Sequence, residues 1–242
     1  MYTSDSSSEA EFGLVDLSER FLREIRGGEI HGPIRDRIAE LASPQLASLD
    51  RRERLAFWIN VYNAAAQATL QGRPARYEHR RRFFSEPLVT VSGTGLSLDE
   101  IEHGILRRSR WKYGLGYVPD PFPSSFERRH RLSERDYRIH FALNCGAASC
   151  PAIAAYTADS VDEQLDRATE SYLNGETVVE DGTIYLPRLL LWFRGDFGGR
   201  SGIKRLLREY DLIDPGERPR IRYRKYDWSL ALGNYLDREE RS

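Results

Sequence analysis

Apolar residues recur at helical spacing through the first third of the chain. Leucine, phenylalanine and isoleucine side chains three or four positions apart predict a first helix, at Leu14, Leu17, Phe21 and Ile25. The glycine pair 27–28 is expected to end this helix. A second, short helix is predicted over residues 33–41. Residues 55–72 contain no charged side chain and consist largely of good helix formers. They predict a third helix that is buried at the centre of the fold.

Beyond residue 86 the pattern alternates between strands and short helices. Alternating side chains around glycine-containing turns predict two hairpins, over residues 87–98 and 177–187. Further helices are predicted over 99–106, 161–173, 189–193 and 201–210, with helical turns starting at Pro151. Single strands are predicted over 139–144 and 221–224. The stretch 113–132 is rich in glycine, proline and aromatic residues and predicts a long surface loop able to cover a cleft.

This order of elements predicts the α+β class. We expect N-terminal helices and a central buried helix packed on a small, mostly antiparallel sheet. The 242 residues, 40% of them hydrophobic, suffice for one sizeable core. A single globular domain is therefore predicted over residues 12–242, preceded by a disordered tail over residues 1–11.

Three uncharged amides share one face of the helix predicted over 55–72. Asn60, Asn63 and Gln67 are spaced i, i+3 and i+7, which places them on one side of the helix. Buried amides must find hydrogen-bond partners inside the protein or line a cleft. This face therefore either caps the backbone of a neighbouring loop or orients a catalytic group. Asn60 is the better candidate for orienting a catalytic group, because its large apolar neighbours indicate the deepest burial.

Charge and targeting signals exclude several classes of partner. The 36 basic residues are balanced by 37 acidic residues, so neither nucleic acid nor an anionic membrane is indicated. No segment is apolar enough to span a bilayer. The first eleven residues lack the basic and apolar regions of a signal peptide, and two cysteines do not form a disulfide framework. These features predict a cytoplasmic protein.

Both cysteines lie within six positions at the end of the strand predicted over 139–144. Cys145 and Cys150 enclose a loop of small residues that starts at Gly146 and is closed by Pro151. Small side chains leave backbone N–H groups unobstructed, as an oxyanion hole requires. The combination suits a nucleophile, a pair of metal ligands or a redox pair.

Five blocks of the sequence resemble the signature blocks of domain of unknown function 547. They occur in the family's order and span about residues 50–230: Phe57–Ala64, Ile101–Leu106, His140–Pro151, Tyr185–Leu190 and Asp227–Ser229. The resemblance implies a single globular domain, similar to papain-like or transglutaminase-like folds, whose activity is open. It also implies that the position of Cys145 is the more regular of the two cysteine positions.

A catalytic thiol needs a partner that lowers its pKa from about 8.5 and protonates the leaving group, and histidine is the usual partner. His103 lies in an apolar block that the resemblance covers. We therefore expect Cys145 to attack, His103 to act as acid and base, and Asn60 to orient the imidazole. The alternative site residues are Cys150, at an N-cap-like position before Pro151, His140, Glu102 and Asn63.

These residues predict a cysteine-dependent acyl-transfer enzyme. It would be a hydrolase or transferase acting on an amide or thioester of a small molecule or peptide, without a cofactor. One alternative is a non-catalytic protein-binding module that uses the aromatic and arginine residues of 111–131. The others are a redox pair and a metal-binding domain whose ligands would be His103, His140, Cys145 and Cys150, although this spacing is not one of the usual zinc knuckles.

Overall fold

The chain folds around one long, buried helix, α4 (Arg51–Gly72). A capping box starts it, because the Asp50 carboxylate accepts from the Glu53 N–H while the Glu53 carboxylate accepts from the Asp50 N–H. Most residues of α4 are buried on every side, which explains the absence of charge between 55 and 72. The predicted central helix is thus confirmed in the computed structural model, which describes residues 12–236. Residues 1–11, predicted as a disordered tail, and residues 237–242 lie outside the described part.

The remaining helices are short and surround α4. α1 (Leu14–Arg26) packs along α4 and buries one apolar face, as its spacing predicts. The other α-helices are α2 (Pro33–Ala39), α3 (Ser43–Ser48), α5 (Arg80–Ser85), α6 (Ser125–His130), α7 (Val161–Glu176), α8 (Leu189–Trp192) and α9 (Gly199–Glu209). Two 3₁₀-helices, η1 (Pro74–His79) and η3 (Tyr137–Phe141), and a π-helix, η2 (Glu100–Leu106), complete the set in the described residues.

The described strands form two small sheets. β1 (Val89–Val91) and β2 (Thr94–Leu96) form an antiparallel hairpin. β3 (Val178–Glu180) and β4 (Thr183–Leu186) form a second hairpin, and β5 (Arg220–Tyr223) joins β4 in parallel. Both predicted hairpins and the C-terminal strand are confirmed.

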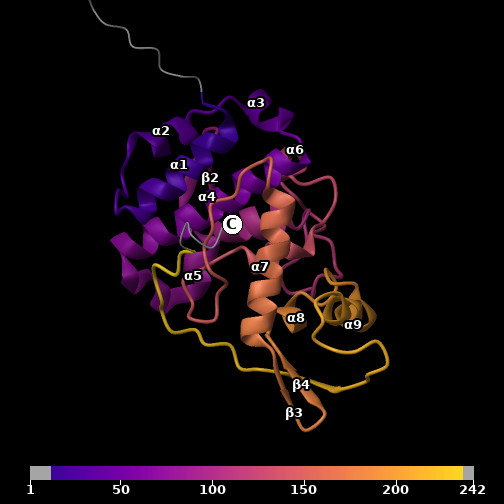
Figure 1. Cartoon of the computed structure of the whole chain (residues 1–242). Coiled ribbons are helices and arrows are strands. Elements are labelled where there is room, and N and C mark those ends of the chain that lie inside the picture. The colour runs from indigo at the N-terminus through magenta and orange to yellow at the C-terminus, as the bar shows by residue number, and fades with distance from the viewer. Residues whose placement is uncertain (1–11, 237–242) are drawn as a thin grey trace, which may run out of the picture.

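Two apolar clusters are joined by α7. Val161 and Leu165 of α7 belong to the cluster around α4, whereas Tyr172 and Leu173 belong to the cluster formed with β4, α8 and α9. Figure 1 shows α7 running from the N-terminal helices to the hairpin of β3 and β4 at the opposite end. The result is a single domain of the α+β class. Within residues 12–236, no helix combines the length and the apolar composition that a bilayer crossing requires.

Four local predictions differ from the structure. The stretch 113–132, predicted as a surface loop, contains the short helix α6, because the Ser124 side chain caps it by accepting from the Glu127 N–H. Residues 139–144 were expected as a strand but form the end of η3 and an irregular segment, because Asp136 caps the turn and none of the strands in residues 12–236 pairs with this segment. The residues after Pro151 are extended instead of helical, and Ile153 forms a bridge with Tyr235. The helix predicted over 99–106 is present as the π-helix η2, a form that is frequent at functional sites.

Candidate functional site

Buried amides of α4 attach the loop that carries both cysteines. The Asn63 side chain donates to the Ala142 carbonyl at 2.9 Å and accepts from the Asn144 N–H at 2.8 Å. Gln67 donates to the Asn144 side-chain oxygen at 3.2 Å, and Asn144 donates to the Pro151 carbonyl at 2.7 Å. Asn63 and Gln67 therefore fix the loop backbone, which is the first of the two roles considered for this face.

Asn60 fixes a different segment. Its side chain donates to the Tyr156 carbonyl at 2.8 Å and to Ser18 Oγ at 3.2 Å, and it accepts from the Tyr156 N–H at 2.9 Å. All of these partners lie away from His103. The structure thus assigns Asn60 to the backbone after the cysteine loop, and the expectation that it orients the imidazole is wrong.

The two thiols are in direct contact. The Sγ atoms of Cys145 and Cys150 lie 3.1 Å apart, and Cys150 Sγ also accepts from the Cys145 N–H at 3.2 Å and lies 3.2 Å from the Tyr226 hydroxyl. Burial alone would raise the pKa of Cys150, but the hydrogen bonds from the Cys145 thiol, Tyr226 and the Cys145 N–H outweigh it and lower this pKa to about 7. The pKa of Cys145 is raised, first by its hydrogen bond to Cys150 and then by burial. Cys150 is therefore the sulfur that ionises first.

Three of the four N–H groups at residues 146–149 are not free for an oxyanion. Gly146 donates to the Asn144 side chain at 2.8 Å, Ala148 to the Ser229 carbonyl at 2.8 Å, and Ser149 to the Asp227 carbonyl at 3.2 Å. These bonds attach the C-terminal segment to the loop. The expected oxyanion hole at residues 146–149 therefore lacks three of its four donors, and the remaining one, the Ala147 N–H, is directed to the cysteine sulfurs.

Both sulfurs face a cavity of about 180 Å³. Aromatic rings, two carboxylates and two imidazoles share its wall, and the lining comprises Tyr62, Phe84, Asp99, Glu102, His103, His140, Leu143, Cys145, Cys150, Pro151, Leu189, Trp192, Phe193, Tyr226 and Trp228. The fold thus brings η2, η3, the cysteine loop, α8 and the C-terminal segment to one place. A larger groove of about 750 Å³ between α1 and α7 is lined by none of the predicted site residues.

His103 lies in this cavity wall, but its two ring nitrogens face Arg107 and Asp99. Arg107 lies 2.8 Å from Nδ1, and since a guanidinium only donates, Nδ1 must carry the lone pair. The proton is then on Nε2, which faces Asp99 Oδ1 at 3.5 Å. Burial, followed by the charge of Arg107, lowers the pKa of His103 well below its usual value. His103 is therefore neutral, and its basic nitrogen is occupied by Arg107.

Glu102 is the titratable carboxyl of the cavity wall. It lies on η2 beside His103, and its Oε2 accepts from the Tyr62 hydroxyl at 3.4 Å. Burial raises the pKa of Glu102 to about 7. The positive charge of Arg107 acts against this rise, and the negative charge of Asp99 adds to it. Both protonation states are then populated at neutral pH, as an acid and base catalyst requires.

Asp196 contacts His140 directly and His103 through Arg107, and it was not found from the sequence. Its Oδ2 accepts from His140 Nε2 at 2.9 Å and from Arg107 Nε at 2.7 Å, and its Oδ1 accepts from Arg135 at 3.0 Å. Burial opposes ionisation, but the hydrogen bonds and charges of His140 and Arg107 hold the pKa of Asp196 well below its usual value. The available signal was a lone acid in the glycine-rich stretch 195–199, which gives no indication of its partners.

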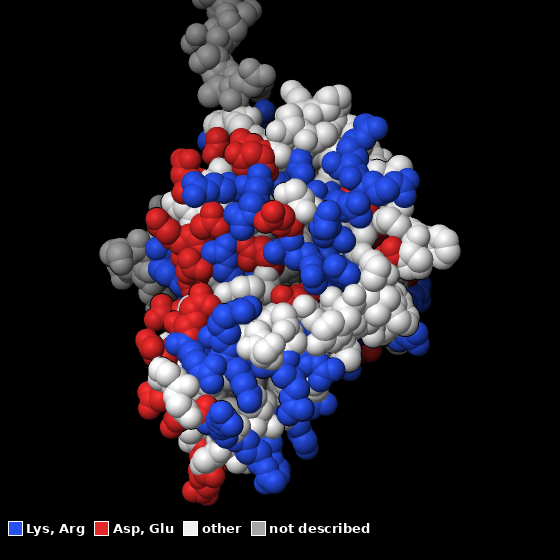
Figure 2. Space-filling model, turned by 90° about the vertical axis from the view of Figure 1, so that its right-hand side faces the viewer, with Lys and Arg blue, Asp and Glu red and all other residues white. Residues whose placement is uncertain are grey.

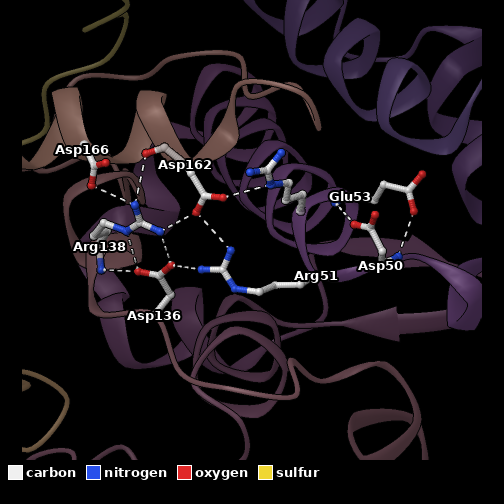
Figure 3. A network of polar contacts seen from close by, with 8 residues as sticks. Asp50, Arg51, Glu53, Asp136, Arg138, Asp162 and Asp166 are labelled. Atoms are coloured by element: carbon white, nitrogen blue, oxygen red, sulfur yellow. Dashed lines mark hydrogen bonds and ion pairs between the residues drawn. The ribbon is translucent and has the colours of Figure 1, made fainter.

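An ion-pair network positions η3, which carries His140. Arg138 contacts the carboxylates of Asp136 and Asp162 at 2.6 Å each, and Arg51 at the start of α4 contacts the same two carboxylates. Figure 3 shows this bridge between α4, η3 and α7, with Asp166 as a further partner of Arg138. The network holds three elements together at the back of the cavity wall.

No metal centre is formed by the predicted ligands. Among residues 12–236, no group of three or more histidine, cysteine or acidic side chains is arranged to hold a metal ion. His103 and His140 instead bond to Arg107 and Asp196, and the sulfurs contact each other and Tyr226. The metal-binding alternative therefore finds no support in the described residues.

Comparison with known proteins gives the family. The family model described as a protein of unknown function, DUF547, matches residues 46–173. The chain belongs to this family. Neither the curated proteins nor the solved structures include a match to the chain, so the predicted likeness to papain-like or transglutaminase-like folds is not confirmed. The matched region includes α4, η2 and the cysteine loop, whereas Asp196 and Tyr226 lie beyond it.

Proposed function

We propose that this DUF547 chain is a cysteine-dependent acyl-transfer enzyme whose nucleophile is Cys150. The observation that carries the proposal is the convergence of three hydrogen-bond donors on Cys150 Sγ inside a cavity. A pKa of about 7 makes about half of Cys150 thiolate at neutral pH. Cys145, the nucleophile that the sequence favours, acts as a donor that stabilises this thiolate.

Glu102 takes the acid and base role that the sequence suggests for His103. The Cys150 thiolate attacks the acyl carbon of an amide or thioester, and the bond to the leaving group breaks as the leaving group takes the proton of Glu102. Ionised Glu102 then removes a proton from water or from an acceptor. That group attacks the acyl-cysteine and releases the Cys150 thiolate, which returns the site to its initial state.

The cavity favours a small acyl group with apolar or planar character. Its volume of about 180 Å³ lies below that of pockets that enclose drug-sized ligands, which start at about 300 Å³. Trp192, Tyr226 and Trp228 contact one another and form an aromatic part of the wall. A short acyl chain, or one end of a longer peptide or small molecule, therefore fits best.

Acylation by an activated thioester tests this proposal. A phenyl thioester of a short acid is mixed with the full chain, and intact mass reports the acyl-enzyme. Acylation is expected in the wild type and in Cys145→Ser and is lost in Cys150→Ser. Because phenylthiolate needs no proton to leave, Glu102→Gln is expected to acylate but to deacylate slowly, so that the acyl-enzyme accumulates.

Matched measurements separate these roles from general damage. The exposed residue Glu163 of α7 provides the control Glu163→Gln, which is expected to behave as the wild type. Deacylation of the wild type should rise with pH through about 7, and this rise should be absent in Glu102→Gln. Persistent acylation of Cys150→Ser, or equal turnover in Glu102→Gln, would show that the roles are assigned wrongly.

A non-catalytic binding module is the second candidate, and one surface feature favours it. Six large apolar side chains are exposed within a dozen residues: Trp111, Tyr113, Leu115, Tyr117, Val118 and Phe122. Figure 2 shows lysine and arginine side chains gathered over the face that includes α6 and α9. Tryptophan, tyrosine and arginine are the residues that most often anchor a protein partner. A biological activity that survives Cys150→Ser but is lost in Phe122→Ser would support the module over the enzyme.

A further inference from the structure

The cysteine pair is arranged for a reaction of its own. The Sγ atoms lie 3.1 Å apart, compared with about 2.0 Å in a disulfide, so bond formation needs a movement of only about 1 Å. The loop already brings the sulfurs together. It turns at Gly146, whose φ is +90° and where a Cβ would lie 2.5 Å from Leu70 Cδ1, so only glycine fits at this turn. The two thiols are therefore close enough to form a disulfide after a small shift of their side chains.

The two sulfurs are also different from each other. Cys150 Sγ accepts hydrogen bonds from the Cys145 N–H and the Tyr226 hydroxyl. The Cys145 thiol is placed to donate a hydrogen bond to Cys150 Sγ. One sulfur is thus prepared to attack and the other to remain a thiol in contact with it. This is the division between an attacking and a resolving cysteine.

We propose that the Cys150–Cys145 pair reduces a small hydroperoxide and closes an intramolecular disulfide. The Cys150 thiolate attacks the terminal peroxide oxygen, the O–O bond breaks, and the departing alkoxide or hydroxide takes a proton from Glu102. Cys150 is now a sulfenic acid. The Cys145 sulfur attacks it, the S–O bond breaks, and the hydroxyl group leaves as water with the Cys145 proton. A dithiol of the surroundings then supplies two electrons and two protons and restores both thiols.

The surroundings of the pair favour a hydroperoxide over a larger oxidant. Cys145 is 8% exposed and Cys150 is 6% exposed, and both are reached through the cavity of about 180 Å³. A hydroperoxide is small enough to enter, whereas a protein disulfide would have to place its sulfur against buried Cys150. The proposal shares the Cys150 thiolate with the acyl-transfer proposal but needs no acyl substrate.

The test uses the full chain with hydrogen peroxide and with tert-butyl hydroperoxide. In the wild type, one equivalent of oxidant is expected to remove both free thiols and to give a monomer lighter by two hydrogen atoms, which dithiothreitol reverses. Cys145→Ser should stop at a sulfenic acid on Cys150 that dimedone traps. Cys150→Ser should react on the order of tenfold or more slowly, because the remaining thiol ionises poorly.

Each remaining outcome is informative. Tyr226→Phe keeps both thiols and should slow the first step at pH 6, so the proposal stays testable even if Cys150→Ser does not fold. Slow oxidation at equal rates on both cysteines, disulfides between molecules, or sulfenic acid on Cys145 would overturn it. Acylation at Cys150 without disulfide formation would contradict the peroxide-reduction proposal and support the acyl-transfer proposal. Rapid disulfide formation without acylation would contradict the acyl-transfer proposal and support peroxide reduction.

Discussion

The hydroxyl of Tyr226 offers the sharpest test of the cysteine assignment. It lies 3.2 Å from Cys150 Sγ, and a hydrogen bond to a charged group contributes about 1.5–3 kcal/mol. One pH unit in the ionisation midpoint corresponds to about 1.4 kcal/mol. Tyr226→Phe, which retains the ring and its packing, is therefore expected to raise the midpoint of Cys150 ionisation by about one to two pH units.

The same change has opposite effects on the rate at low and at high pH. A midpoint that is one unit higher leaves about a tenth of the thiolate at pH 6, but a more basic thiolate is about threefold more nucleophilic. Alkylation should therefore be about threefold slower at pH 6 and about threefold faster at pH 9. General loosening of the fold would instead accelerate alkylation at both pH values.

The assay is the rate of iodoacetamide labelling between pH 5 and 10. Tyr226→Phe and its control are each made in the Cys145→Ser background. Only Cys150 is then labelled, and the serine hydroxyl still donates a hydrogen bond to it. Tyr223→Phe, three residues earlier, is the matched control and should leave the profile unchanged. The assignment is refuted if the parent has its midpoint near 9, or if Tyr226→Phe leaves the profile where it was.

Two further predictions concern the supports of the site. Asn63→Ala leaves the buried Ala142 carbonyl and the buried Asn144 N–H without partners. It should lower the free energy of unfolding, measured by urea denaturation, by about 2–5 kcal/mol. The control Thr69→Ala on the same helix should change this free energy by less than about 0.5 kcal/mol. Asp196→Asn leaves the buried Arg107 without its counter-ion and should cost about 3–5 kcal/mol at pH 7. Because the pKa of Asp196 is lowered by folding, its contribution is present at neutral pH and declines as the pH falls below about 4, so wild type and variant should converge in acid. A constant difference across that pH range would contradict this explanation.

The sequence predicted the elements whose burial is either periodic or complete. The spacing of apolar residues gives α1, the lack of charge gives α4, and glycine-centred alternation gives both hairpins. It also singled out residues that the fold brings together, because both cysteines, His103 and His140 line one cavity. The pattern failed at residues 139–144, where side chains are buried in every direction and no alternation remains to distinguish a strand from a turn.

The roles inside the cavity were decided by tertiary structure alone. A buried polar group is defined by its hydrogen-bond partner, and here the partners lie far away in the chain: Asn63 bonds to Asn144, and His140 bonds to Asp196. Local spacing carries no information about such pairs. The amino-acid sequence by itself therefore determined the long helices α1, α4 and α7 and the two hairpins, whose apolar patterns are local. Only the folded structure decided that Arg107 occupies the nitrogen of His103 and that Cys150, with Tyr226 beside it, is the more acidic thiol, because both results depend on charges and donors brought together from distant segments.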